Sequence, residues 1–172
     1  MIQLNFLVEH MGNSQLAFAL TSTLNDLADT RSDLDAIVYY NTMHRIYMTP
    51  KFAMMQMVEA WGQPGYTIAT SVATARKMLS FPGTQKRLFY VWDLEWIRGE
   101  QIYYDMFAPL YQDPSIVLIA RSKIHADAIN NCFNTGVVKP CHKDIHIVDD
   151  FNEEQLLEVI QNERINPRCC AA

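Results

Sequence analysis

The strand–helix pattern of this chain is clearest in residues 2–28, IQLNFLVEHMGNSQLAFALTSTLNDLA. A short apolar run, residues 2–8, ends at a polar loop, residues 9–14, and leucines then recur at helical spacing. Asn13 or Ser14 can begin that helix, because either side chain can accept a hydrogen bond from its first free amides. A strand, a tight turn and a helix form the opening unit of a doubly wound α/β fold.

The same unit recurs along the rest of the chain. Further strands are predicted from apolar runs at residues 36–40, 66–70, 87–92, 115–120 and 144–148. Helices are predicted after Thr49-Pro50, after Ser71, over residues 100–111 and 124–133, and from Asn152. This alternation predicts a Rossmann-like, doubly wound α/β fold with a mostly parallel sheet of about six strands. We expect residues 1–165 to form a single domain and residues 166–172 a loosely ordered tail.

The composition fits a globular domain. Of the 172 residues, 49% are hydrophobic and 19% are charged. The net charge of -5 makes nucleic acid an unexpected partner, because duplex binders usually carry a basic surface. The apolar runs are too short to cross a membrane and no secretion signal begins the chain, so we expect a cytoplasmic protein.

No metal or other cofactor is predicted. The group Cys141, His142 and His146 matches no zinc spacing, and none of the four cysteines forms a C-x-x-C pair. Neither the G-x-G-x-x-G fingerprint nor a phosphate loop is present, because the first loop holds a single glycine.

Candidate site residues follow the strands, because ligands of open parallel sheets bind beyond the carboxyl ends of the strands. In the first loop, Gly12 would let a ligand approach the backbone, and Asn13 and Ser14 precede a helix start that favours an anion. Beside Glu9, His10 could act as a general base on a hydroxyl. The alternative is a histidine that only hydrogen-bonds within its own loop.

The loop Trp92-Asp93-Leu94-Glu95-Trp96 is the most unusual of the strand ends. Its two carboxylates suit acid–base chemistry, and its indole rings suit stacking against sugar rings or bases. In the alternative interpretation the indoles pack beneath the loop and Asp93 caps a turn.

Two further strand ends add candidates. The pair Thr70 and Ser71 most simply caps a helix. The pair Arg121 and Ser122 places a guanidinium where it suits a phosphate or a carboxylate, although a surface ion pair is the ordinary alternative.

Four segments together resemble a known family. They are residues 6–14 (FLVEHMGNS), 68–71 (IATS), 89–96 (FYVWDLEW) and 118–122 (LIARS). The set resembles the N-terminal domain of GT-B glycosyltransferases, and in particular short glycosyltransferase-like proteins of large tailed phages. The resemblance covers the chain from Ile2 to about Ile160.

The resemblance implies a domain that binds a nucleotide-sugar or a sugar acceptor at the strand ends. His10 or Asp93 would be the catalytic base, and a phage-encoded protein would work in the host cytoplasm. The ligand-binding residues would be Glu9, Gly12, Asn13, Ser14, Thr70, Ser71, Trp92, Glu95, Trp96, Arg121 and Ser122.

The resemblance also leaves two functions open. A GT-B enzyme needs a second domain, which holds most of the donor site, and the sequence shows one domain. Either a partner chain or a homo-oligomer completes the cleft, or the domain only binds, to a small nucleotide or to a host protein. A signalling module of the response-regulator type is disfavoured, because Glu9-His10 stands where paired acidic residues are expected.

Overall fold

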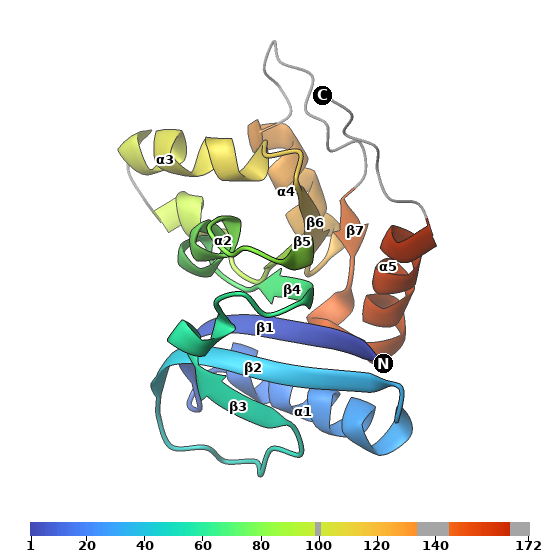
Figure 1. The fold of residues 1–172 in the computed structure, drawn as a ribbon. Helices are drawn as coiled ribbons and strands as arrows, with labels where there is room; N and C mark the ends of the chain where they lie inside the picture. Colours follow the sequence, from blue (N-terminus) through green and yellow to red (C-terminus); the bar gives the residue numbers. More distant parts are fainter. Residues whose placement is uncertain (99–100, 134–144, 166–172) are drawn as a thin grey trace.

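The computed structural model describes residues 1–98, 101–133 and 145–165 (Figure 1). Its strands are β1 (Ile2–Met11), β2 (Leu34–Met43), β3 (Ala53–Gln56), β4 (Gly65–Ala69), β5 (Thr84–Val91), β6 (Ile116–Ala120) and β7 (His146–Ile147). The α-helices are α1 (Gln15–Thr30), α2 (Val72–Leu79), α3 (Gln101–Tyr111), α4 (Lys123–Phe133) and α5 (Glu153–Ile165). Three short 3-10 helices complete the fold: η1 (Met57–Ala60), η2 (Glu95–Arg98) and η3 (Asp149–Phe151).

The strands form one parallel sheet in the order β3-β2-β1-β4-β5-β6-β7. The predicted Rossmann-like α/β fold is therefore confirmed, with a seven-stranded sheet. The chain builds outward from β1 to β3 on one side and from β4 to β7 on the other. The junction of β1 and β4 is thus the point where strand order reverses, next to which ligands of such sheets bind.

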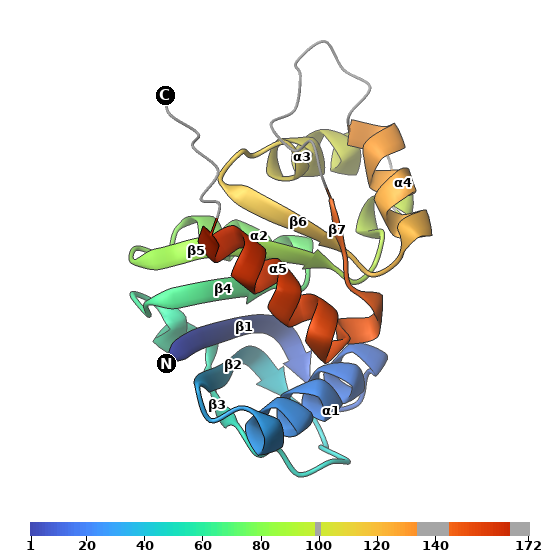
Figure 2. The same ribbon diagram turned by 90° about the vertical axis from the view of Figure 1, so that its right-hand side faces the viewer.

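Helices cover both faces of the sheet. Figure 2 shows α1 and α5 in front of the sheet, and the helices α2, α3 and α4 pack into the core of the other face. The α1–α5 face buries Leu4, Phe6 and Val8 of β1 against leucines of α1 and α5. The other face buries Leu7, Val72, Ala75, Met78, Phe89, Leu118 and Ile129. Strands buried on both faces explain the nearly continuous apolar runs in the sequence.

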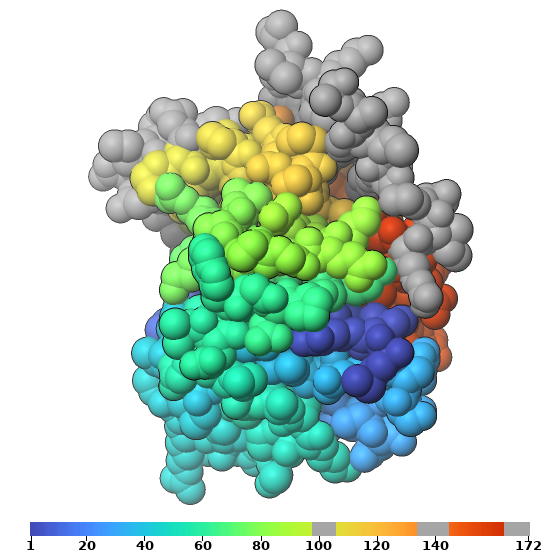
Figure 3. All heavy atoms as spheres, in the orientation of Figure 1, coloured from blue at the N-terminus to red at the C-terminus, as the bar shows by residue number. Residues whose placement is uncertain are grey.

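The helix predicted to start at Thr49-Pro50 is wrong, because the segment forms β3 and the short η1 instead. The Thr49 carbonyl and the Lys51 amide lie where this helix would begin, and both hydrogen-bond to Asn25 of α1. Its side chain donates to the Thr49 carbonyl at 3.0 Å and accepts from the Lys51 amide at 2.7 Å. The chain then pairs with β2, from Ile37 opposite Ala53 to Tyr40 opposite Gln56. In Figure 3 this teal-green segment lies on the molecular surface.

The predicted helix starts are otherwise confirmed where the structure describes them. Ser14 caps α1 and Ser71 caps α2. At α5, Asn152 accepts from the Gln155 amide at 3.1 Å, while the Gln155 side chain accepts from the Asp149 amide at 2.7 Å. That second bond fixes η3 onto α5.

Several predictions lie outside the described residues. They concern Cys141, His142 and the tail 166–172. In the described ranges, no helix has the length and the apolar content that crossing a membrane requires.

Candidate functional site

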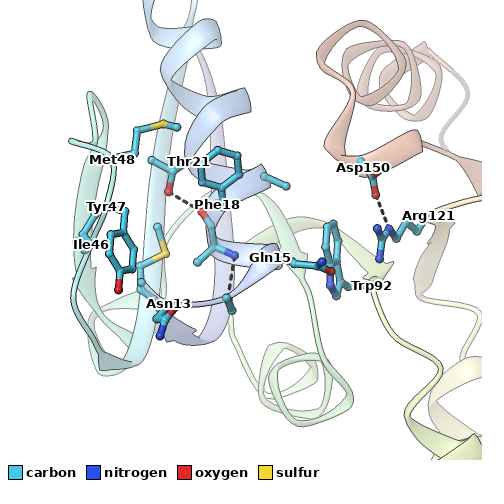
Figure 4. A pocket seen from close by; sticks show the side chains of 15 residues that line it. Asn13, Gln15, Phe18, Thr21, Ile46, Tyr47, Met48, Trp92, Arg121 and Asp150 are labelled. Atoms are coloured by element: carbon cyan, nitrogen blue, oxygen red, sulfur yellow. Dashed lines mark hydrogen bonds and ion pairs between the residues drawn. The ribbon is translucent and has the colours of Figure 1, made fainter.

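A cavity of about 720 Å³ lies at the carboxyl end of β1, beside the start of α1. Its lining joins the first loop to the loop before β3 and to the ends of β5, β6 and β7 (Figure 4). The lining residues are Met11, Gly12, Asn13, Ser14, Gln15, Ala17, Phe18, Ala19, Thr21, Ile46, Tyr47, Met48, Trp92, Arg121 and Asp150.

Gly12 brings two loops together at this cavity. Its φ of 128° is a conformation that side chains disfavour, and a Cβ there would lie 2.8 Å from the His44 carbonyl oxygen. The His44 amide also donates to the Met11 carbonyl at 2.7 Å. This close approach positions the following residues, Ile46 to Met48, in the cavity lining.

The start of α1 supplies polar groups. The Ser14 side chain accepts from the Ala17 amide at 3.1 Å, and the Ser14 carbonyl accepts from the Phe18 amide at 3.0 Å. The amides of Gln15 and Leu16 precede the helix's own hydrogen bonds, so they are donors at the positive end of the helix dipole. Figure 4 shows the Gln15 side chain pointing toward Trp92.

Trp92, Arg121 and Asp150 form a charged and aromatic group on the side of the cavity opposite the loop of Ile46–Met48 (Figure 4). The guanidinium of Arg121 lies over the Trp92 ring, 4.1 Å from its centroid, and Arg121 Nε donates to the Asp150 carboxylate. Arg121 is 32% exposed and Asp150 is 64% exposed.

An unusual turn in η3 holds Asp150. Both Asp150 (φ 43°) and Phe151 (φ 63°) are left-handed, which is uncommon for a bulky residue. Phe151 is fixed by its neighbours. Its amide donates to the Tyr90 hydroxyl at 3.0 Å, its ring stacks on Tyr90 with centroids 3.9 Å apart, and its carbonyl accepts from Thr23 at 2.9 Å. The turn is therefore held by the core.

Tyr90 is the buried anchor of this turn. Its hydroxyl donates to the Val148 carbonyl at 2.7 Å while accepting from Phe151. Burial raises the pKa of Tyr90 well above its ordinary value of 10.0, so the hydroxyl stays protonated and keeps donating. The ring of Trp92 stacks against Phe151, which extends the same aromatic group to the cavity.

Five of the residues predicted from the sequence come together at the cavity. They are Gly12, Asn13, Ser14, Trp92 and Arg121. They come from the ends of three different strands, and their roles in binding stay predictions.

The other residues of the first loop and of the helix caps lie elsewhere. His10 is exposed, bonds to the Thr42 side chain and does not line the cavity, and neither does Glu9. The Thr70 hydroxyl donates to the Leu7 carbonyl at 2.9 Å, and the Ser71 side chain accepts from the Thr74 amide. The Ser122 side chain accepts from the His125 amide at the start of α4.

In the 92–96 loop, Trp92 lines the cavity and Trp96 packs into the core. Trp96 is buried, with its ring edge-to-face against Tyr111 and Phe133 at centroid distances of 5.0 and 4.9 Å. Glu95 accepts from the Val72 amide at 2.9 Å and so supports the start of α2. Asp93 is half-buried and lies outside the cavity lining.

The sequence prediction missed several lining residues. Asp150 follows the last strand, and this position at a strand end was the signal that could have identified it. No local pattern marks Ile46, Tyr47 and Met48 as lining residues, because they precede a segment whose spacing predicts a helix. Gln15 and Phe18 lie on α1, and the leucine spacing that predicts this helix does not show which of its other residues line a cavity.

The described residues contain no group of three or more His, Cys, Asp or Glu side chains placed to hold a metal ion. No family model, curated protein or solved structure matches the chain. The cavity and its lining are therefore the basis for a functional proposal.

Proposed function

We propose that this chain is a glycosyltransferase-like domain that binds a nucleotide-sugar or a sugar acceptor in the cavity beside β1 and α1. The observation that carries the proposal is the cavity itself, at the end of the strand where the order of the sheet reverses. Its volume of about 720 Å³ falls within the range usual for small-molecule sites.

The chemistry of the lining supports a ligand with an apolar ring and a polar part. Phe18, Tyr47 and Met48 offer an apolar surface against which a base or the face of a sugar can pack. Asn13, Gln15 and Arg121 offer hydrogen-bond donors for hydroxyl or phosphate oxygens. In the enzymatic form of this proposal, a partner chain or a second copy completes the cleft.

A second candidate function is binding without catalysis. A general base must reach the proton it removes, directly or through one water. Among the described residues that line the cavity, the charged ones are Arg121 and Asp150, and these two are paired with each other. The exposed position of His10 outside the lining favours this second candidate.

A thermal-unfolding screen tests the binding that both candidates share. The panel contains nucleotide-sugars, the matching nucleotides and nucleosides, and free sugars. A ligand at about 100 times its Kd should stabilise the fold by about 2.7 kcal/mol. Phe18→Ala should weaken that stabilisation. Ile124→Ala, which also trims an exposed apolar side chain but lies outside the cavity, should not. Failure of every compound to stabilise the protein would contradict the proposal.

A turnover assay separates the two candidates. Release or transfer of sugar by the purified chain, lost in His10→Ala, would support the enzyme. Binding without turnover, unchanged by His10→Ala, would support the binding protein.

A further inference from the structure

Arg121 is held from two directions at the edge of the cavity. Its guanidinium lies over Trp92, and its Nε atom donates to Asp150. Exposed ion pairs add little to stability, so the pairing of Arg121 with a 64% exposed carboxylate matters mainly for where the guanidinium points.

The ion pair with Asp150 uses only one of the nitrogen atoms of the Arg121 guanidinium. The bond to Asp150 engages Nε, and within the described part of the chain no hydrogen bond joins the terminal amino groups of Arg121. Because Arg121 lines the cavity, these amino groups are donors available to a ligand. The planar fork of such donors matches the oxygens of a phosphate group.

The charge balance favours an anion near Arg121 despite the neighbouring carboxylate. Asp150 is twice as exposed as Arg121, at 64% against 32%, so water screens its charge more strongly. The start of α1, another part of the lining, adds the partial positive charge of its free amides.

The position of Asp150 depends on the core and not on a ligand. The left-handed turn at Asp150 and Phe151 is fixed through Tyr90 and Thr23. The guanidinium is therefore oriented before a ligand arrives, which reduces the entropy lost on binding.

We infer that Arg121 recognises a phosphate group of the ligand, with Asp150 and Trp92 as positioning residues. This assignment rests on the proposed function, since it concerns the same cavity, and it names the chemical class of the ligand: a phosphate ester or diphosphate. The apolar part of the ligand then packs toward Phe18, Tyr47 and Met48.

Calorimetric titration with inorganic pyrophosphate tests the assignment without depending on a sugar or a base. Arg121→Gln and Arg121→Lys should both bind more weakly, Arg121→Gln by about 10- to 100-fold, since hydrogen bonds to charged groups are worth about 1.5–3 kcal/mol. Lys123→Gln removes the same charge two residues away, outside the lining, and should bind like the wild type. Thermal unfolding of each variant confirms that it folds.

Asp150→Asn tests how the neighbouring carboxylate affects anion binding at Arg121, because it keeps an acceptor for the Arg121 Nε atom. Asparagine also tolerates a left-handed backbone and keeps an oxygen that accepts from Arg121, but it removes a negative charge. Pyrophosphate should therefore bind roughly two- to fivefold more tightly, which corresponds to a partly exposed charge pair. A neutral nucleoside or sugar should bind as before.

The outcomes separate this inference from the proposed function. Pyrophosphate binding that survives Arg121→Gln would overturn the inference, and so would a wild type that binds neutral sugars or nucleosides but not pyrophosphate. That last result would leave the proposed function intact. Pyrophosphate binding that needs Arg121, with no binding of any nucleotide or sugar, would support the inference and overturn the proposed function.

Discussion

Arg121 and Trp92 stack because the strands before them are paired in register. Val91 lies opposite Ala120 in the parallel pair β5–β6, so the residues that follow each strand emerge side by side. The guanidinium carbon of Arg121 consequently lies 4.1 Å from the centroid of the Trp92 ring. The register of two buried strands thus places a cation and an indole at one edge of the cavity.

Gly12→Ala should destabilise the fold and disturb the cavity. The variant combines an unfavourable positive φ, which costs about 1–3 kcal/mol, with a Cβ that meets the His44 carbonyl oxygen at 2.8 Å. Gly62→Ala is the matched control, because its φ of 77° is also positive but its Cβ would meet nothing within 4 Å. Urea denaturation should show a larger loss for Gly12→Ala, and equal losses would contradict the close packing of the two loops.

Tyr90→Phe should destabilise the protein by about 1–3 kcal/mol, because it leaves the Phe151 amide and the Val148 carbonyl without their shared partner. Tyr47→Phe, in an exposed ring, should change the free energy of unfolding by less than about 0.5 kcal/mol. Thermal unfolding measures both. A neutral effect of Tyr90→Phe would mean that the η3 turn does not depend on this hydroxyl.

Alkaline pH should remove the contribution of Tyr90. Burial raises its folded-state pKa above the ordinary value of 10.0, so its contribution is complete below that pH. Above it the unfolded chain releases the proton first, and the free energy of unfolding falls by about 1.4 kcal/mol per pH unit for this group. Urea denaturation between about pH 8 and pH 11 should show the wild type losing its advantage over Tyr90→Phe. A constant difference would argue against the raised pKa.

Asn25→Ala should loosen the loop that carries Tyr47 and Met48. Asn25 is buried and bonds to the backbone of Thr49 and Lys51, so its loss should cost about 1–3 kcal/mol. The neighbouring exposed Asp26→Ala is the control. Hydrogen exchange should become faster at Lys51 in Asn25→Ala alone, and unchanged exchange would contradict this role of Asn25.

The fold was predictable because each buried strand leaves an apolar run and each helix leaves a periodic one. The exception was β3, where apolar residues at 52, 55, 58 and 61 fit a helical spacing. The segment that leads into β3 hydrogen-bonds to Asn25, a residue on α1, and no local pattern contains that information.

The candidate site was predictable only at the level of strand ends. Sequence order placed Gly12, Trp92 and Arg121 at such ends, and the parallel sheet brings them to one cavity. Trp92 lines the cavity, whereas Trp96 is buried. The chain turns into η2 between them, and this turn places the Trp96 ring beneath α3 and α4. Side-chain direction within a loop depends on such packing, which spacing alone does not encode.

The most direct test of the account is an NMR titration that follows the three indole N–H signals while nucleotide-sugars or free sugars are added. The three tryptophans report on different places: Trp92 on the cavity, Trp61 on an exposed surface next to η1, and Trp96 on the core. We predict that the Trp92 signal shifts with saturation, together with the amides of residues 12–18, while Trp61 and Trp96 stay in place. A Trp92 signal that moves neither with any nucleotide-sugar nor with free sugars, or shifts centred on Trp61, would contradict the account.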